Sequence, residues 1–365
     1  GKADSGAVTI SAITFNDPIT ILGAAMSVTA LQAAANNITL TSTSTIDELA
    51  DNNTTDITTS GTLALTAQGA IGAAGATGAL DLTVGTLQAT TNSGGIFVLE
   101  SSALTVGGTG VNTTGADAEI QITLTAGNLT LADDITANGS GNVTLVLSAA
   151  SAQLITGEAA DDIVSGTGDI SITADVLTLV GGNITSVGGA LTLQPLSAAQ
   201  SVGISGGGGT FSLTTTEIDL LSNGFSSIAI GRTDGTALMT INADTFLDPI
   251  TFRMGGVSGD ILTVGALTTT DLAMTFTAGT GNSGTFVQTD DASTIATGTG
   301  AITVNADLIA LSTTVNTVTT TGAITLQPTT AGRPIVIGAA GGASDFALST
   351  AEIAALTDNA AQRGQ

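Results

Sequence analysis

A long stretch of this 365-residue chain occurs twice. The first copy starts at Gly189 and reads Gly-Ala-Leu-Thr-Leu-Gln-Pro, then a glycine-rich patch, then Phe-Ser-Leu-Thr-Thr-Thr-Glu-Ile. The second copy starts at Gly322 and keeps this order with small changes. The glutamines of the two copies lie 133 positions apart (327 − 194) and their glutamates 135 (352 − 217). Self-similarity at long period is typical of solenoids, whose units stack on their neighbours, so the repeat favours a stacked, elongated fold.

A second repeated segment shows where each unit of the repeat begins. Thr14-Phe-Asn-Asp-Pro-Ile-Thr matches Thr245-Phe-Leu-Asp-Pro-Ile-Thr, and Gly1-Lys-Ala-Asp matches Gly231-Arg-Thr-Asp. We therefore predict two units of one continuous solenoid, residues 1–230 and a shorter unit 231–365. Because the chain starts and ends at nearly the same phase, we expect either that one molecule continues into the next or that the chain is a piece of a larger repetitive protein.

Eight positions mark the repeated motif and are predicted to be structural. A Ser or Thr precedes each glutamate, a pattern typical of a capping box, so we expect short helical turns at a corner of the coil. The Gly-Arg-Thr-Asp-Gly segment predicts a turn held by an ion pair or by arginine bonds to carbonyl groups. The motif positions are Gln194, Pro195, Glu217, Arg232, Asp234, Gln327, Pro328 and Glu352.

Alternation of apolar and polar residues predicts short strands along the whole chain. Glycine, asparagine and aspartate separate these strands, and all three residue types are common in turns. Strands at this spacing suit a β-sandwich or barrel as well, but the long-period repeat favours an all-β parallel β-helix with corners rich in Gly, Asn and Asp. Coils of about 20–22 residues would give roughly 16–18 of them. Examples are Ile120-Gln-Ile-Thr-Leu124, Val143-Thr-Leu145, Ile170-Ser-Ile172 and Ile324-Thr-Leu326.

Composition excludes several classes of function. The chain has no Cys and no His, so disulfides, thiolate metal sites and histidine-based catalysis are excluded. Its 30 acidic and 5 basic residues give a net charge of −25, which does not suit nucleic-acid binding, and no apolar run predicts insertion into a membrane. With nine Phe and no Trp or Tyr, small and β-branched residues are expected to fill a narrow core.

Acidic residues in predicted turns are candidates for calcium. Carboxylate and amide oxygens suit this ion, and the densest clusters lie at residues 51–56 and 133–134. A solvated acidic surface is the alternative interpretation. Glycosidases also use paired carboxylates, but carbohydrate sites usually add aromatic platforms, so we expect no enzyme activity. The calcium candidates are Asp51, Asp56, Asp133 and Asp134.

The motif residues give a family resemblance. Leu-Thr-Leu-Gln-Pro, the glycine patch, Phe-x-Leu-Thr-Thr-x-Glu-Ile, Gly-Arg-x-Asp-Gly and Asp-Pro-Ile-Thr-Phe together resemble the repeats of large bacterial surface exoproteins of the filamentous-haemagglutinin type. The resemblance implies a right-handed parallel β-helix, secreted to the cell surface or outside the cell, that acts as a shaft or adhesive surface. Its expected partners are the rest of a larger repeat protein or surface glycans.

Two further functions stay open at this point. One is a filament subunit that binds copies of itself head to tail or laterally through open β-helix ends. The other is a calcium- or carbohydrate-binding module. Apart from calcium, no cofactor is expected.

Overall fold

The chain folds into a parallel-stranded β-solenoid of about 13 turns with little helix. A computed structural model describes residues 6–50, 52–75, 77–157, 161–281 and 283–358. Strand pairings among these residues run parallel, as in Ile120↔Val143 and Ile250↔Met274. The prediction of a β-helix is therefore confirmed, and the sandwich and barrel alternatives are wrong. The right-handed winding stays a prediction.

Contacts divide the chain into two compact units, which are described separately. The first comprises Gly1–Ala190 with Leu220–Ser222, and the second Leu191–Asp219 with Asn223–Gln365. The units 1–230 and 231–365 were predicted from the repeated sequence, whereas these two units are defined by contacts. The division into two sequence repeats stays a prediction.

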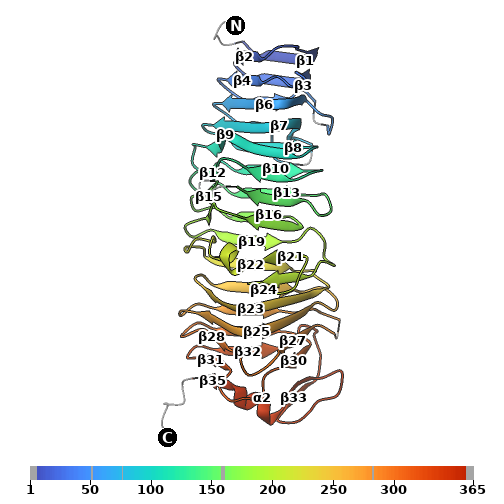
Figure 1. Cartoon of the computed structure of the whole chain (residues 1–365), viewed down its shortest axis with the longest axis vertical. Coiled ribbons are helices and arrows are strands. Elements are labelled where there is room, and N and C mark those ends of the chain that lie inside the picture. Colours follow the sequence, from blue (N-terminus) through green and yellow to red (C-terminus); the bar gives the residue numbers. More distant parts are fainter. Residues whose placement is uncertain (1–5, 51, 76, 158–160, 282, 359–365) are drawn as a thin grey trace. The chain divides into compact units, whose positions relative to one another are not determined.

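Three successive coils of the first unit contain three strands each. Figure 1 shows the strands of this unit stacked one above the next. One coil holds β10 (Ile120–Leu124), β11 (Leu129–Leu131) and β12 (Ile135–Ala137). Each pairs with its counterpart in the next coil, which holds β13 (Val143–Leu147), β14 (Gln153–Thr156) and β15 (Ile163–Ser165). The following coil holds β16 (Ile170–Thr173), β17 (Val176–Leu179) and β18 (Ile184–Thr185).

The predicted coil length is wrong. Strand pairing joins residues of neighbouring coils that lie from 18 positions apart (26 − 8), at Val8↔Met26, to 38 positions apart (356 − 318), at Val318↔Leu356. The chain therefore makes about 13 turns and not the roughly 16–18 expected from the strand spacing. One cause is the third strand of coils such as the one that contains Ile135–Ala137, because Ile135 is followed two positions later by the small Ala137 and not by a second large apolar residue.

Longer strands build the N-terminal coils of this unit. β6, β7 and β9 each pair with more than one strand of a neighbouring coil and shift register on the way. Inward-facing aliphatic side chains of successive coils, such as Ile120, Val143 and Ile170, are almost fully buried and form the core. The strands are β1 (Val8–Thr14), β2 (Ile19–Gly23), β3 (Met26–Gln32), β4 (Ile38–Ser42), β5 (Ile46–Glu48), β6 (Ile57–Ala67), β7 (Leu80–Thr91), β8 (Ile96–Glu100) and β9 (Leu104–Thr113).

The second unit adds aromatic residues to the aliphatic core. Phe252 stacks on Phe276 with ring centroids 5.5 Å apart, and Phe246 and Phe286 extend the cluster on either side. Its strands are β19 (Ala190–Gln194), β20 (Val202–Ile204), β21 (Phe211–Leu213), β22 (Ser227–Arg232), β23 (Leu238–Phe246), β24 (Ile250–Met254), β25 (Asp260–Thr269), β26 (Met274–Thr277), β27 (Thr285–Gln288), β28 (Ile295–Ala296), β29 (Ile302–Asn305), β30 (Leu308–Ala310), β31 (Val318–Thr320), β32 (Ile324–Gln327), β33 (Ile335–Ile337), β34 (Phe346–Leu348) and β35 (Leu356–Asp358).

The two copies of the repeated motif have the same local structure. β20 and β21 pair in parallel and lead into helix α1 (Thr215–Ile218), and β33 and β34 pair in parallel and lead into α2 (Thr350–Ala355). Both helices begin with a complete capping box, which confirms the predicted helical turns. Neither helix, among the residues described, has the length and apolarity needed to cross a membrane.

Candidate functional site

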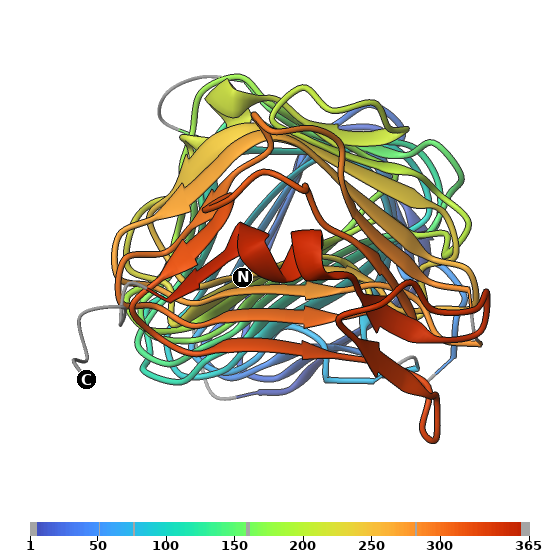
Figure 2. The same ribbon diagram turned by 90° about the horizontal axis from the view of Figure 1, so that it is seen from below.

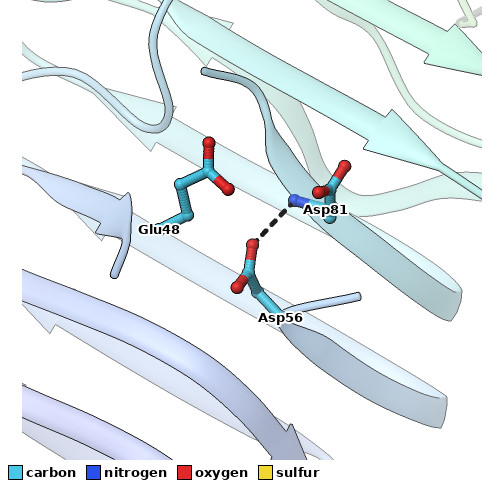
Figure 3. Close-up of side chains that lie close together, drawn as sticks. All are labelled: Glu48, Asp56 and Asp81. Carbon is cyan, nitrogen blue, oxygen red and sulfur yellow. Dashed lines mark hydrogen bonds between the residues drawn. The ribbon is translucent and has the colours of Figure 1, made fainter. Parts of the chain in front are cut away.

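Three buried acidic side chains meet in the N-terminal unit (Figure 3). Glu48 ends β5, Asp56 directly precedes β6, and Asp81 is the second residue of β7. One carboxylate oxygen of each residue lies within 4.8 Å of the others. These acids are only 6%, 2% and 5% exposed, respectively. No other group of three acidic side chains comes this close in the described part of the chain.

Pairing between coils places Asp56 beside Asp81. The Asp56 N–H donates to the Asp81 carbonyl at 2.8 Å, and the Asp81 N–H donates to Asp56 Oδ2 at 3.2 Å. Glu48 Oε2 accepts a hydrogen bond from the Asn52 N–H at 3.3 Å. Residues 25 positions apart are therefore brought together by one turn of the solenoid.

The environment of this acidic cluster opposes negative charge. Burial, together with the neighbouring carboxylates of Glu48, Asp81 and Asp47, raises the pKa of Asp56 to about 7, although the hydrogen bond from the Asp81 N–H favours the charged form. Burial also raises the pKa of Asp81 to about 6. Asp81 Oδ2 is buried and makes no hydrogen bond to a described group. At neutral pH the cluster therefore favours binding a proton or another positive charge.

Glu100 shows how a buried acid is satisfied elsewhere in the same unit. Its side chain is fully buried, but Oε2 accepts from the Val84 N–H at 3.0 Å and Oε1 accepts from the Ser102 N–H and hydroxyl at 2.8 and 2.6 Å. Burial still raises the pKa of Glu100, and these bonds lower it. Hydrogen bonds within the protein therefore stabilise both carboxylate oxygens of Glu100, in contrast to Asp81 Oδ2 in the three-acid cluster.

The cluster has chemistry in common with divalent-cation sites. Calcium takes six to eight oxygen ligands, so three carboxylates would form part of a coordination shell that other oxygens would complete. The same three groups can instead share a proton, because carboxylates this close cannot all be charged without strong repulsion.

The predicted calcium residues do not gather in one place. Asp51 lies outside the described residues. Asp56 joins Glu48 and Asp81, two acids that the sequence did not single out. Glu48 and Asp81 were missed because their contact depends on the length of each turn, and no local spacing reveals it. Calcium binding itself stays a prediction.

Asp133 and Asp134 bind backbone groups. Asp133 Oδ1 accepts from the Asp134 N–H at 2.9 Å, and Asp134 Oδ1 accepts from the Asp162 N–H of the next coil at 2.8 Å. Asp162 in turn accepts from the Asn183 N–H one coil further on, at 2.6 Å. These side chains form a ladder that ties successive corners together. Burial raises the pKa of Asp134, and the N–H of Asp162 lowers it.

Residues of the repeated motif hold turns in the second unit. Arg232 pairs with Asp234 through Nε–Oδ1 at 2.7 Å and Nη2–Oδ2 at 2.9 Å, and its Nη1 donates to the carbonyls of Pro195 and Leu196. The pair raises the pKa of Arg232 and lowers that of Asp234. Both bonding modes expected for this turn therefore occur together.

The other motif residues are also found at strand and helix ends. Gln194 and Gln327 end β19 and β32, and Pro195 and Pro328 follow them. Gln327 Nε2 donates to Asn305 Oδ1 at 2.7 Å. Glu217 and Glu352 close the capping boxes, and Glu352 Oε1 also accepts from the Leu311 N–H at 3.1 Å.

Fold and site together define a parallel β-solenoid that carries a buried acidic cluster. No family model, no curated protein and no solved structure matches the chain.

Proposed function

We propose that the protein is a structural β-solenoid that forms part of a bacterial surface filament, stalk or adhesin outside the cell. It works mechanically and not as an enzyme. Parallel hydrogen-bond ladders resist the separation of neighbouring coils along the stacking direction, and burial of the aliphatic ladders, at about 25 cal/mol per Å² of apolar surface, stabilises the stack.

The observation that supports this role is the continuity of pairing. Within each unit, strands of one coil pair with strands of the next. Several buried acidic side chains accept hydrogen bonds from backbone N–H groups of their own or a neighbouring coil, among them Asp161, Asp175 and Asp307. Most strands of the fold therefore form hydrogen bonds that hold neighbouring coils together. The motif also resembles repeats of filamentous-haemagglutinin-type exoproteins. From this resemblance we propose a right-handed winding and a location at the cell surface. The proposed partners are the rest of a larger repeat protein or surface glycans.

Immunogold labelling of the organism that encodes the chain tests this proposal. An antibody against the purified chain is expected to label the outside of intact, unpermeabilised cells, on filaments or stalks. Labelling that requires permeabilised cells would contradict it. An antibody against a cytoplasmic protein of the same cells is the control for leakage.

A further inference from the structure

The cluster of Glu48, Asp56 and Asp81 lies in a stretch of chain that has no basic side chain. The sequence contains no Lys, Arg or His from residue 3 to residue 231. The charged groups that act on the pKa of Asp56 are accordingly all acidic. Buried carboxylates need a compensating positive charge, so the cluster takes up either protons or a cation from solution.

Asp81 has a carboxylate oxygen that the described part of the protein leaves unsatisfied. The residue is only 5% exposed, and its buried Oδ2 accepts no hydrogen bond from a described group. Glu100 in the same unit is also buried, but N–H and hydroxyl groups bind both of its oxygens. Figure 3 shows the three carboxylates of the cluster grouped around one space. An ion placed among them would supply the partner that Asp81 lacks.

The spacing of the cluster suits calcium. One carboxylate oxygen of each acid lies within 4.8 Å of the others. Calcium holds its ligands at about 2.3–2.6 Å, so two oxygens on one ion can lie up to about 5 Å apart. Magnesium holds its ligands at about 2.0–2.1 Å in a strict octahedron, which allows no more than about 4.2 Å. A single calcium ion therefore spans every separation within the limit of the cluster, and magnesium spans only the shorter ones.

A groove beside Asp81 gives an ion access from solvent. Strands of this unit, drawn in blue to green, lie one behind the next when viewed along the stack, so paired residues of neighbouring coils share a face (Figure 2). Asp81 pairs with Leu99. Leu99 lines a groove of about 390 Å³ together with residues that include Asn53, Ala79 and Thr123. The groove therefore opens next to the cluster and offers a path for a hydrated ion.

From these observations we propose that Glu48, Asp56 and Asp81 bind one calcium ion. The ion ties the corner between β5 and β6 to β7 of the next coil. Water and carbonyl oxygens complete its shell of about six to eight ligands. Its charge takes the place of a basic side chain, and its role is structural. The site is independent of the proposed location at the cell surface.

Equilibrium dialysis of the full chain against radioactive calcium tests this site. After metal is removed with chelator, the wild type at physiological ionic strength is expected to bind one tightly held ion per chain. Asp81→Asn removes a carboxylate without adding bulk, so the affinity should fall at least about tenfold. The matched control is Asp134→Asn, which keeps an acceptor for the Asp162 N–H outside the cluster and should bind as the wild type does. Lack of saturable binding by the folded wild type, or equal binding by Asp81→Asn, would overturn the proposal.

Terbium, which prefers the same oxygen ligands as calcium, tests whether the ion is buried. Luminescence lifetimes of bound terbium in light and heavy water report how many water molecules remain on the ion. We expect fewer than on free terbium, with displacement by calcium and little displacement by magnesium. Bound terbium that keeps the hydration of the free ion would mean loose association with the acidic surface and would contradict a site inside the cluster. Circular dichroism checks that the wild type and both variants keep the β-solenoid.

Discussion

Protonation of Asp56 affects the stability of the fold. Burial and three neighbouring carboxylates raise its pKa to about 7, and one backbone N–H opposes them. An acid whose pKa is higher in the folded state favours folding fully below its unfolded pKa of about 4. That contribution is lost as the pH rises through about 7.

Asp56→Asn removes this dependence on pH. The variant keeps an oxygen that accepts the Asp81 N–H but has no charge to bury, so we expect it to be more stable than the wild type at pH 8 by about 1–2 kcal/mol, and equal to it at pH 4. Chemical denaturation at both pH values measures the difference. Asp133→Asn, at a residue outside the cluster, is the control. A variant less stable than the wild type at pH 8 would contradict the account.

The calcium prediction for Asp56 is tested by metal removal. If the acidic cluster holds calcium, millimolar calcium should raise the melting temperature of the wild type by several degrees and chelator should reverse the rise. Asp81→Asn should abolish the effect. Identical melting curves with calcium and with chelator would contradict calcium binding by this cluster.

Glycines stack where successive coils approach closely. A Cβ added at Gly168 would lie 2.4 Å from the carbonyl oxygen of Gly141, and one at Gly189 would lie 1.9 Å from that of Gly168. We expect Gly168→Ala to destabilise the protein by about 1–3 kcal/mol, because the backbone must shift. Gly208 has open space around it, so Gly208→Ala is the matched control. Urea unfolding compares the two, and equal midpoints would refute the close-approach argument.

Individual strands and helices were predictable to different degrees. The apolar–polar alternation identified strands of four or five residues such as β10 and β32, and the Ser/Thr-to-Glu spacing identified both helical turns. The third strands of β12 and β15 type were not predicted because the residue two positions after their Ile is small: Ala137 follows Ile135, and Ser165 follows Ile163. The contact of Glu48, Asp56 and Asp81 was not predicted, because the register between β5, β6 and β7 depends on turn lengths that the local sequence does not reveal.

The aromatic cluster of the second unit is a sharp test of packing between strands. Phe276 lies between Phe252 on β24 and Phe286 on β27 and is fully buried. Phe276→Ala is expected to cost about 3–5 kcal/mol, and Phe276→Leu clearly less, because most of the volume is kept. Thermal unfolding followed by circular dichroism measures both. A loss below about 1 kcal/mol for the alanine variant would show that Phe276 is not held in the core.

At the scale of the molecule, each coil depends on its neighbours. A solenoid gains its stability from coil-to-coil interfaces, so a coil with one uncovered face is the weakest part. The net charge of −25 opposes unspecific association of exposed strand edges.

The most direct test of the parallel solenoid is the direction of one strand pairing within the chain. Parallel pairing places Gln121 beside Thr144 and Thr123 beside Val146. The double variants Gln121→Cys/Thr144→Cys and Thr123→Cys/Val146→Cys should therefore form an internal disulfide readily. The crossed variants, Gln121→Cys/Val146→Cys and Thr123→Cys/Thr144→Cys, should not. Preferential crosslinking of the crossed variants would mean antiparallel strands and would contradict the fold described here.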